Sequence, residues 1–332
     1  MIYIPKTTVR SASIGGHVGL RGFFKMAAIR KTDGRRRLLA DWFPNIITNG
    51  GRNEMATSGY IQWCHVGDGS AEPAVSDTSL AGFVASTSSA STSQGNQSSA
   101  PYYNSLRRVF LFDEGAAEGN LSEVATSWVS SSAGPIFSRA LIKDEFDEPT
   151  TITVLADEFL EVTYELRIYP PTDDLAFNLV DQGPAETTHG IIVRPADVTS
   201  HPGFIGGAPL GWGHTSQTGA SIAMPGGSSG GSFNRPRAYD GEIQGVTQLP
   251  SGSGENLSNS DYSTLSYVTD SFTRKAEIVA PFGSWNFSIG AMRINFRAGG
   301  TWQIGFDPNI VKDNEQILEL DVEVTWDNYD PE

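Results

Sequence analysis

Alternation of apolar and polar side chains with a period of two is the feature that most constrains the fold of this chain. It is sharpest in the segments 161–169 and 317–326. The apolar positions are Val162, Tyr164, Leu166 and Ile168 in the first segment, and Leu318, Leu320, Val322, Val324 and Trp326 in the second. A period of two places apolar side chains on one face of a β-strand and polar side chains on the other. Both segments therefore predict antiparallel strands with one buried and one solvated face.

Weaker strand signals recur along the rest of the chain. They lie at 23–30, 35–42, 60–66, 107–112, 123–129, 137–141, 276–280, 285–296 and 301–306. The dipeptide Asp33-Gly34 separates the first two runs and is a strong hairpin signal. The chain contains 36 glycines and 18 prolines, and only 18% of its residues are charged. This composition favours turns and strands over helices. We predict a mostly β fold: an antiparallel β-sandwich core with a long loop-rich β insertion or a second β domain.

The pattern divides the chain of 332 residues into four regions. Residues 1–59 are expected to form a basic N-terminal hairpin and docking segment, and residues 60–172 an antiparallel β domain. Residues 173–275, rich in Gly, Ser and Pro, read as an insertion or a second β module, and residues 276–332 as strands that complete a β domain. A short helix is expected at 52–58, and the Ser/Thr-rich stretch 76–100 as an extended loop or arm.

Charge is distributed unevenly along the chain. Residues 1–52 hold ten Lys or Arg against two acids, whereas the whole chain holds 23 against 38 and has a net charge of −15. The overall acidity argues against nucleic-acid binding. The basic start predicts docking to an acidic surface of a neighbouring protein through Arg21, Lys25, Arg30, Lys31, Arg35, Arg36 and Arg37. The alternative is an ordinary solvated basic hairpin.

Several chemical classes lack the residues that they need. Cys64 is the only cysteine, so an intramolecular disulfide is excluded. No apolar run is long enough for a membrane span, and the start lacks the order of a signal peptide, so we expect neither a membrane span nor export by the general route. The five histidines have no metal-ligand spacing, and the acids at 144–148 lack the central glycine of a calcium loop. We therefore expect no cofactor and no metal.

One motif matches the sequence pattern around the nucleophile of some hydrolases. The segment 227–231, GSSGG, matches the Gly-x-Ser-x-Gly pattern around Ser229. A nucleophile elbow requires a strand before the serine and a helix after it, and the flanking Pro-Gly and Ser-Phe-Asn-Arg-Pro sequences favour neither. We therefore predict that the chain is not an enzyme. Aromatic side chains in loop-like contexts, Tyr102, Tyr103 and Trp212, are instead candidates for contact with a partner or a glycan.

Four segments resemble a known group of proteins. They are WFPNIITNGG (42–51), VGDGSAEPAVSDTSL (66–80), PTTITVLADEFLEVTYELR (149–167) and FDPNIVK (306–312). These resemble structural proteins of tailed bacteriophages, usually described as tail, appendage, fibre-like or hypothetical virion proteins. The resemblance covers most of the first half and the last thirty or so residues, and the middle of the chain is unmatched.

The resemblance implies a virion component with no chemistry of its own. The leading expectation is a structural protein at the tail, baseplate or neck, assembled in the host bacterial cytoplasm as a homo-oligomer of three or six copies or a multiple, with other virion proteins as partners. A receptor-binding or carbohydrate-binding tail fibre or appendage protein is the alternative, with a host-surface glycan as ligand. A serine esterase or depolymerase is a third reading.

Overall fold

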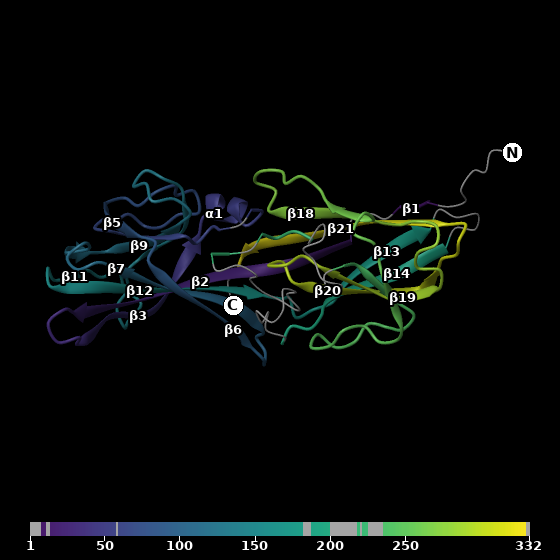
Figure 1. The fold of residues 1–332 in the computed structure, drawn as a ribbon, viewed down its shortest axis with the longest axis horizontal. Helices are drawn as coiled ribbons and strands as arrows, with labels where there is room; N and C mark the ends of the chain where they lie inside the picture. The colour runs from purple at the N-terminus through teal and green to yellow at the C-terminus, as the bar shows by residue number, and fades with distance from the viewer. Residues whose placement is uncertain are drawn as a thin grey trace.

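The computed structural model describes residues 8–10, 14–57, 59–181, 187–199, 218–219, 221–224 and 235–329. The predicted mostly β fold with large antiparallel sheets is confirmed, and α1 (Asn49–Glu54) is the one α-helix in the described part of the chain. The molecule is elongated, and β2 (Ile14–Arg30) runs along its middle and reaches into both halves (Figure 1).

The first half consists of two facing layers that share β3. One layer holds β2, β3 (Arg36–Ile47), β12 (Glu158–Tyr169), β7 (Tyr103–Phe112) and β6 (Ala90–Gln97). The other holds β10 (Ile136–Leu141), β9 (Glu123–Ser127), β4 (Trp63–Gly67) and β5 (Phe83–Thr87). Phe24, Phe43, Phe110 and Tyr164 are fully buried in its core. Their burial supplies the hydrophobic free energy of this sandwich-like half.

A second pair of layers forms the other half. One contains the start of β2 with β1 (Thr8–Arg10), β21 (Ile317–Asn328), β18 (Thr273–Ala280) and β17 (Tyr262–Thr264). The other is a six-stranded sheet of β13 (Leu175–Asp181), β14 (Thr187–Pro195), β20 (Thr301–Val311), β19 (Ser288–Asn295), β15 (Arg237–Tyr239) and β16 (Gly254–Asn256). Trp302 of the six-stranded sheet packs on β2 at Gly16, where a Cβ atom would lie 2.6 Å from its ring. A glycine in β2 therefore lets the two layers approach closely.

The strand β2 joins the two halves because it pairs over its whole length. Residues 14–20 pair with β21 in a parallel register, and residues 19–30 pair with β12 in an antiparallel register. The parallel β2–β21 pairing was not expected from the sequence, since it depends on the return of the chain's last strand to its first. A further two-stranded sheet is formed by β8 (Gly119–Leu121) and β11 (Ile152–Val154).

The four regions expected from the sequence contribute to both halves of the molecule. Residues 14–57 supply β2, β3 and α1, and the strands within 60–172 complete the first half. Strands of 173–275 pair with strands of 276–332, as β17 does with β18 and β14 with β20. The loop predicted at 76–100 is wrong for much of its length, because β5 and β6 lie there and β6 pairs with β7 from Ala90 to Gln97. Ladder hydrogen bonds to a neighbouring strand fix this Ser/Thr/Gln-rich segment without an apolar pattern of its own.

Candidate functional site

The outer face of the first large sheet brings predicted basic residues together with aromatic side chains. Arg21 lies opposite Arg167, and Glu165 lies between Phe23 and Arg107 in the strand register. Directly opposed residues of neighbouring strands share one face of a sheet. The cationic–aromatic face is defined here by Arg21, Phe23, Lys25, Trp42, Tyr103, Arg107, Glu165 and Arg167. It lies opposite the buried face that carries Phe24 and Tyr164.

Phe23 is contacted by two guanidinium groups. Arg21 Cζ lies 5.2 Å and Arg167 Cζ 4.4 Å from the centroid of its ring. Arg167 Cζ also lies 4.5 Å from the ring centroid of Tyr103. These distances are in the range of cation–π attraction, so the arginine side chains are held along the sheet surface.

Trp42 has the same arrangement one strand away. Lys25 Nζ lies 5.8 Å and Arg107 Cζ 5.3 Å from its ring centroid, and the residue is 39% exposed. Lys25 also donates a hydrogen bond of 2.7 Å to Asp41. That hydrogen bond, together with one from the Trp42 N–H, lowers the pKa of Asp41. The carboxylate is therefore ionised and its charge offsets that of Lys25.

Glu165 orients the two arginines at the centre of the face. It is 2% exposed and accepts hydrogen bonds of 2.8 Å and 2.7 Å from Nε of Arg107 and of Arg167. A charge-assisted pair with both guanidiniums fixes their planes. The face carries four cations against the carboxylates of Glu165 and Asp41, so a positive balance remains. The charge and the exposed rings of this face suit an anionic or aromatic partner.

The other predicted docking residues lie at the tip of the β2–β3 hairpin, and most have partners within the chain. The ion pairs are Arg30–Asp157 at 3.7 Å, Lys31–Glu114 at 2.5 Å, Arg36–Glu161 at 2.7 Å and Arg37–Glu158 at 2.9 Å. Arg35 is exposed and makes no ion pair with a described residue. Docking through the hairpin tip stays a prediction, but four of its cations also hold the hairpin against neighbouring segments.

Glu158 is the most buried acid of these pairs. Burial works to raise its pKa, but hydrogen bonds from the Leu155 N–H and from Arg37 prevail and lower it. The hairpin is thus tied to an ionised carboxylate that is 3% exposed.

Two of the three predicted contact aromatics, Tyr102 and Tyr103, lie in the described part of the chain. Tyr103 lies in β7 rather than in a loop, and its ring centroid is 5.4 Å from that of Tyr169, which stacks on Tyr329 at 4.2 Å. Tyr102 is half-buried and packs against the core. Trp212 lies outside the described residues, as does Ser229.

A buried ion cluster was missed by the sequence analysis. Arg139 donates to Glu123 at 2.9 Å, to Asp77 at 2.6 Å and to the carbonyl of Ala71 at 2.7 Å. Glu123 is fully buried and also accepts from the backbone N–H groups of residues 69, 81 and 82. Burial opposes ionisation of Arg139, but its hydrogen bonds to Asp77 and Glu123 raise its pKa. The cluster fixes the loop 67–82, and only the tertiary structure reveals it, because its members are far apart in sequence.

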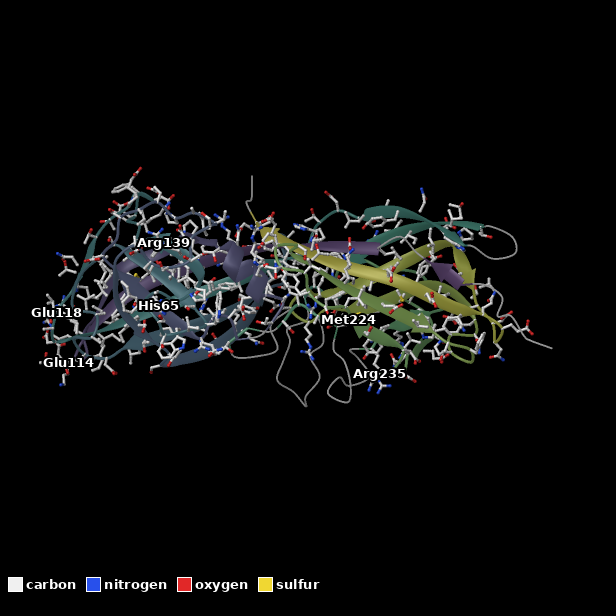
Figure 2. The ribbon with its side chains drawn as sticks, turned by 90° about the horizontal axis from the view of Figure 1, so that it is seen from above. His65, Glu114, Glu118, Arg139, Met224 and Arg235 are labelled. Carbon is white, nitrogen blue, oxygen red and sulfur yellow. The ribbon has the colours of Figure 1, made fainter. Side chains whose placement is uncertain are left out.

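A pocket of about 220 Å³ lies beside this cluster. Its apolar lining comes from Pro44, Ile46, Pro73, Leu141 and Pro149, and Arg139 also lines it. Figure 2 shows Arg139 in the half of the molecule that also holds His65 and Glu114, away from Met224 and Arg235. Residues of the segments 42–51, 66–80 and 149–167 therefore meet at one place in the first half.

The described residues contain no group of three His, Cys, Asp or Glu side chains that could hold a metal ion. His65 and His189 are hydrogen-bonded to the carbonyls of Val129 and Pro308 at 2.9 Å and 2.6 Å. No helix in the described ranges is long and apolar enough to cross a membrane.

Comparison with known proteins gave no match at any of three levels. No protein-family model, no curated protein and no solved structure matches the chain.

Proposed function

We propose that this protein is a structural component of a tailed-phage virion, at the tail, baseplate or neck, and that it acts by protein–protein assembly. The observation that carries the proposal is the cationic–aromatic face. Protein interfaces are enriched in Tyr, Trp, Phe and Arg, and this face presents all four on a rigid sheet. Its arginines are oriented in advance by Glu165, which lowers the entropic cost of binding.

The segments that resemble phage proteins support the same proposal. The segment 42–51 begins with Trp42 of the face, and 149–167 ends with Glu165 and Arg167. The segment 66–80 forms the loop that Arg139 fixes. We propose that these segments are shared with virion proteins because they build this face and its support. An elongated body with a surface of this kind suits repeated contacts in an assembly (Figure 1).

A glycan-binding appendage is the second candidate, and the partial exposure of Trp42 favours it. Sugars stack on open aromatic faces. Here Lys25 and Arg107 lie over the ring of Trp42, and Arg21 and Arg167 over that of Phe23. Rings already covered by cations favour an anionic protein partner over a neutral sugar. We further propose that the chain has no catalytic activity; an esterase or depolymerase would instead show turnover that is lost in Ser229→Ala.

The proposal is tested in purified phage particles. Mass spectrometry of the particles is expected to find this chain in several copies. Arg21→Glu/Lys25→Glu reverses charge on the face and is expected to lower incorporation about tenfold or more, because several surface charge pairs act together. Arg35→Glu tests the hairpin tip, and Lys275→Gln in the second half is the control, because a Glu at this position would face Glu323 across the strand pair.

Three outcomes decide the matter. Absence of the chain from purified particles would overturn the virion proposal. Loss of incorporation on Arg35→Glu alone would assign docking to the hairpin tip. Saturable glycan binding by the purified protein, abolished by Trp42→Ala, would favour the appendage candidate.

A further inference from the structure

The turn between β10 and β11 presents an exposed aromatic side chain among acids. Phe146 is 75% exposed, more than any other large hydrophobic residue in the described part of the chain. Asp144, Glu145, Asp147 and Glu148 flank it and are all exposed. Residues 144–148 are called the acidic Phe146 turn below. A single exposed hydrophobic residue is ordinary on a protein surface, but an aromatic ring surrounded by charges can act as the anchor of an interface.

The turn is rigid. Asp144 accepts hydrogen bonds at 2.9 Å and 3.1 Å from the N–H groups of Phe146 and Glu148, and its own N–H donates to the carbonyl of Glu148 at 3.0 Å. Lys143 forms an ion pair with Asp147 at 2.9 Å, and Asp147 has a φ of 65°, a conformation that Asp adopts more readily than most residues. These contacts fix the backbone of the turn, so Phe146 is presented at one point of the surface. A preorganised contact loses little entropy on binding.

We infer that the acidic Phe146 turn of one copy docks on the cationic–aromatic face of a second copy of this chain. The inference rests on the proposed role of that face in assembly, and it names the partner. The turn has four carboxylates with Lys143 beside it, whereas the face has four cations and the carboxylate of Glu165, with Asp41 beside Lys25. Opposite charges fix the orientation of docking, and the Phe146 ring can pack against the aromatic rings of the face.

The turn makes no described hydrogen bond or ion pair with the face of its own copy. Its base, at Lys143 and Pro149, lines the same pocket as Pro44, and the polar contacts of residues 144–148 stay within 143–148. The exposed Phe146 ring and the carboxylates around it are therefore open to a second copy. Two different surfaces then meet in a heterologous contact, which closes into a ring or continues as a filament. Rings of three or six copies fit the assembly proposed above.

A charge-exchange experiment tests the inference. The face-reversed variant is Arg21→Glu/Lys25→Glu, and the turn-reversed variant is Glu145→Lys/Glu148→Lys. The second leaves Asp144 and Asp147 in place because they hold the turn. Each variant alone is expected to self-associate about tenfold more weakly than the wild type by sedimentation velocity. An equimolar mixture is expected to recover association, because each reversed surface then finds an opposite charge.

Phe146 is tested separately. Phe146→Ser is expected to weaken self-association about tenfold, since an aromatic anchor is lost. Val311→Ser is the matched control, because Val311 is 70% exposed and lies outside both surfaces. Circular dichroism and thermal melting show whether each variant retains its fold.

The outcomes separate this inference from the proposed function. A wild-type protein that stays monomeric at all concentrations overturns the inference, as does a folded pair of variants that fails to recover association when mixed. If the inference fails in either of these ways but the face-reversed variant is still lost from particles, the proposed function stands and the face binds a different partner. If self-association behaves as expected but the chain is absent from particles, the inference stands and the virion role fails.

Discussion

At the scale of single residues, buried ionisable groups set the local stability of this protein. Glu123 and Arg139 are 0% and 2% exposed and lie in direct contact. Removing one partner of such a pair leaves an uncompensated buried charge, whereas removing both does not. The pair therefore stabilises the loop 67–82 only while both of its charged partners are present.

Arg139→Leu is expected to lower the free energy of unfolding by about 3–5 kcal/mol, because the Glu123 carboxylate then lacks its cation. The double variant Glu123→Gln/Arg139→Leu is expected to lose less. Urea denaturation followed by circular dichroism measures both. Equal losses in the two variants would contradict the role assigned to the pair.

His65 makes stability depend on pH. It is 1% exposed, and burial lowers its pKa despite the hydrogen bond to the carbonyl of Val129. Below its unfolded pKa of 6.5, the unfolded chain binds a proton more readily than the folded one. Stability is therefore complete above that pH and is expected to fall as the pH drops through 6.5 toward the lower folded pKa.

The measurement compares urea midpoints at about pH 7.5 and about pH 5. His65→Gln removes the titrating group while keeping a donor for the carbonyl, so it is expected to reduce the difference between the two midpoints. His17, whose pKa is also lowered by burial, remains as a background contribution in both proteins. An unchanged difference would show that His65 does not contribute.

At the scale of elements, the β2–β3 hairpin shows that basic residues can serve the fold. Arg36 and Arg37 bind Glu161 and Glu158 of β12, whereas Arg35 has no such partner among the described residues. Arg36→Ser/Arg37→Ser is expected to destabilise the protein by about 1–3 kcal/mol, since Glu158 loses a charged hydrogen bond while buried. Arg35→Ser is expected to change stability by less than about 0.5 kcal/mol.

Thermal melting of the two variants near neutral pH measures this difference. It is expected to shrink as the pH falls, because the lowered pKa of Glu158 means that its contribution is present above the unfolded pKa and is lost on protonation. Equal melting temperatures for both variants would show that the two ion pairs are solvated and do not contribute to the stability of the fold.

At the scale of the whole molecule, β2 couples the two halves. It pairs with β12 in the first half and with β21 in the second, so neither half is complete without it. We expect one cooperative unfolding transition by tryptophan fluorescence and circular dichroism. Phe24→Ala in the first half and Ile278→Ala in the second remove fully buried side chains and are each expected to cost about 2–5 kcal/mol. Both should shift that single transition, and two separate transitions would show that the halves unfold independently.

Local sequence patterns are sufficient to predict the class of fold and many of its strands. Alternation at 161–169 and 317–326 and the Asp33-Gly34 turn are local patterns, and local patterns are enough to place β12, β21 and the β2–β3 hairpin. The sequence also identified Arg21, Lys25 and Tyr103 as candidate contact residues, although not that they share one surface.

Which distant segments meet is visible only in the folded chain. The tertiary structure turned the Ser/Thr/Gln-rich stretch at 90–97 into a strand by pairing it with β7, and it returned β21 to lie parallel to β2. It also placed Arg107 and Arg167 beside Arg21 and Phe23, and Arg139 beside Glu123. None of these contacts leaves a periodic trace in the sequence, because strand pairing between distant segments depends on the burial of the whole sheet and not on either segment alone.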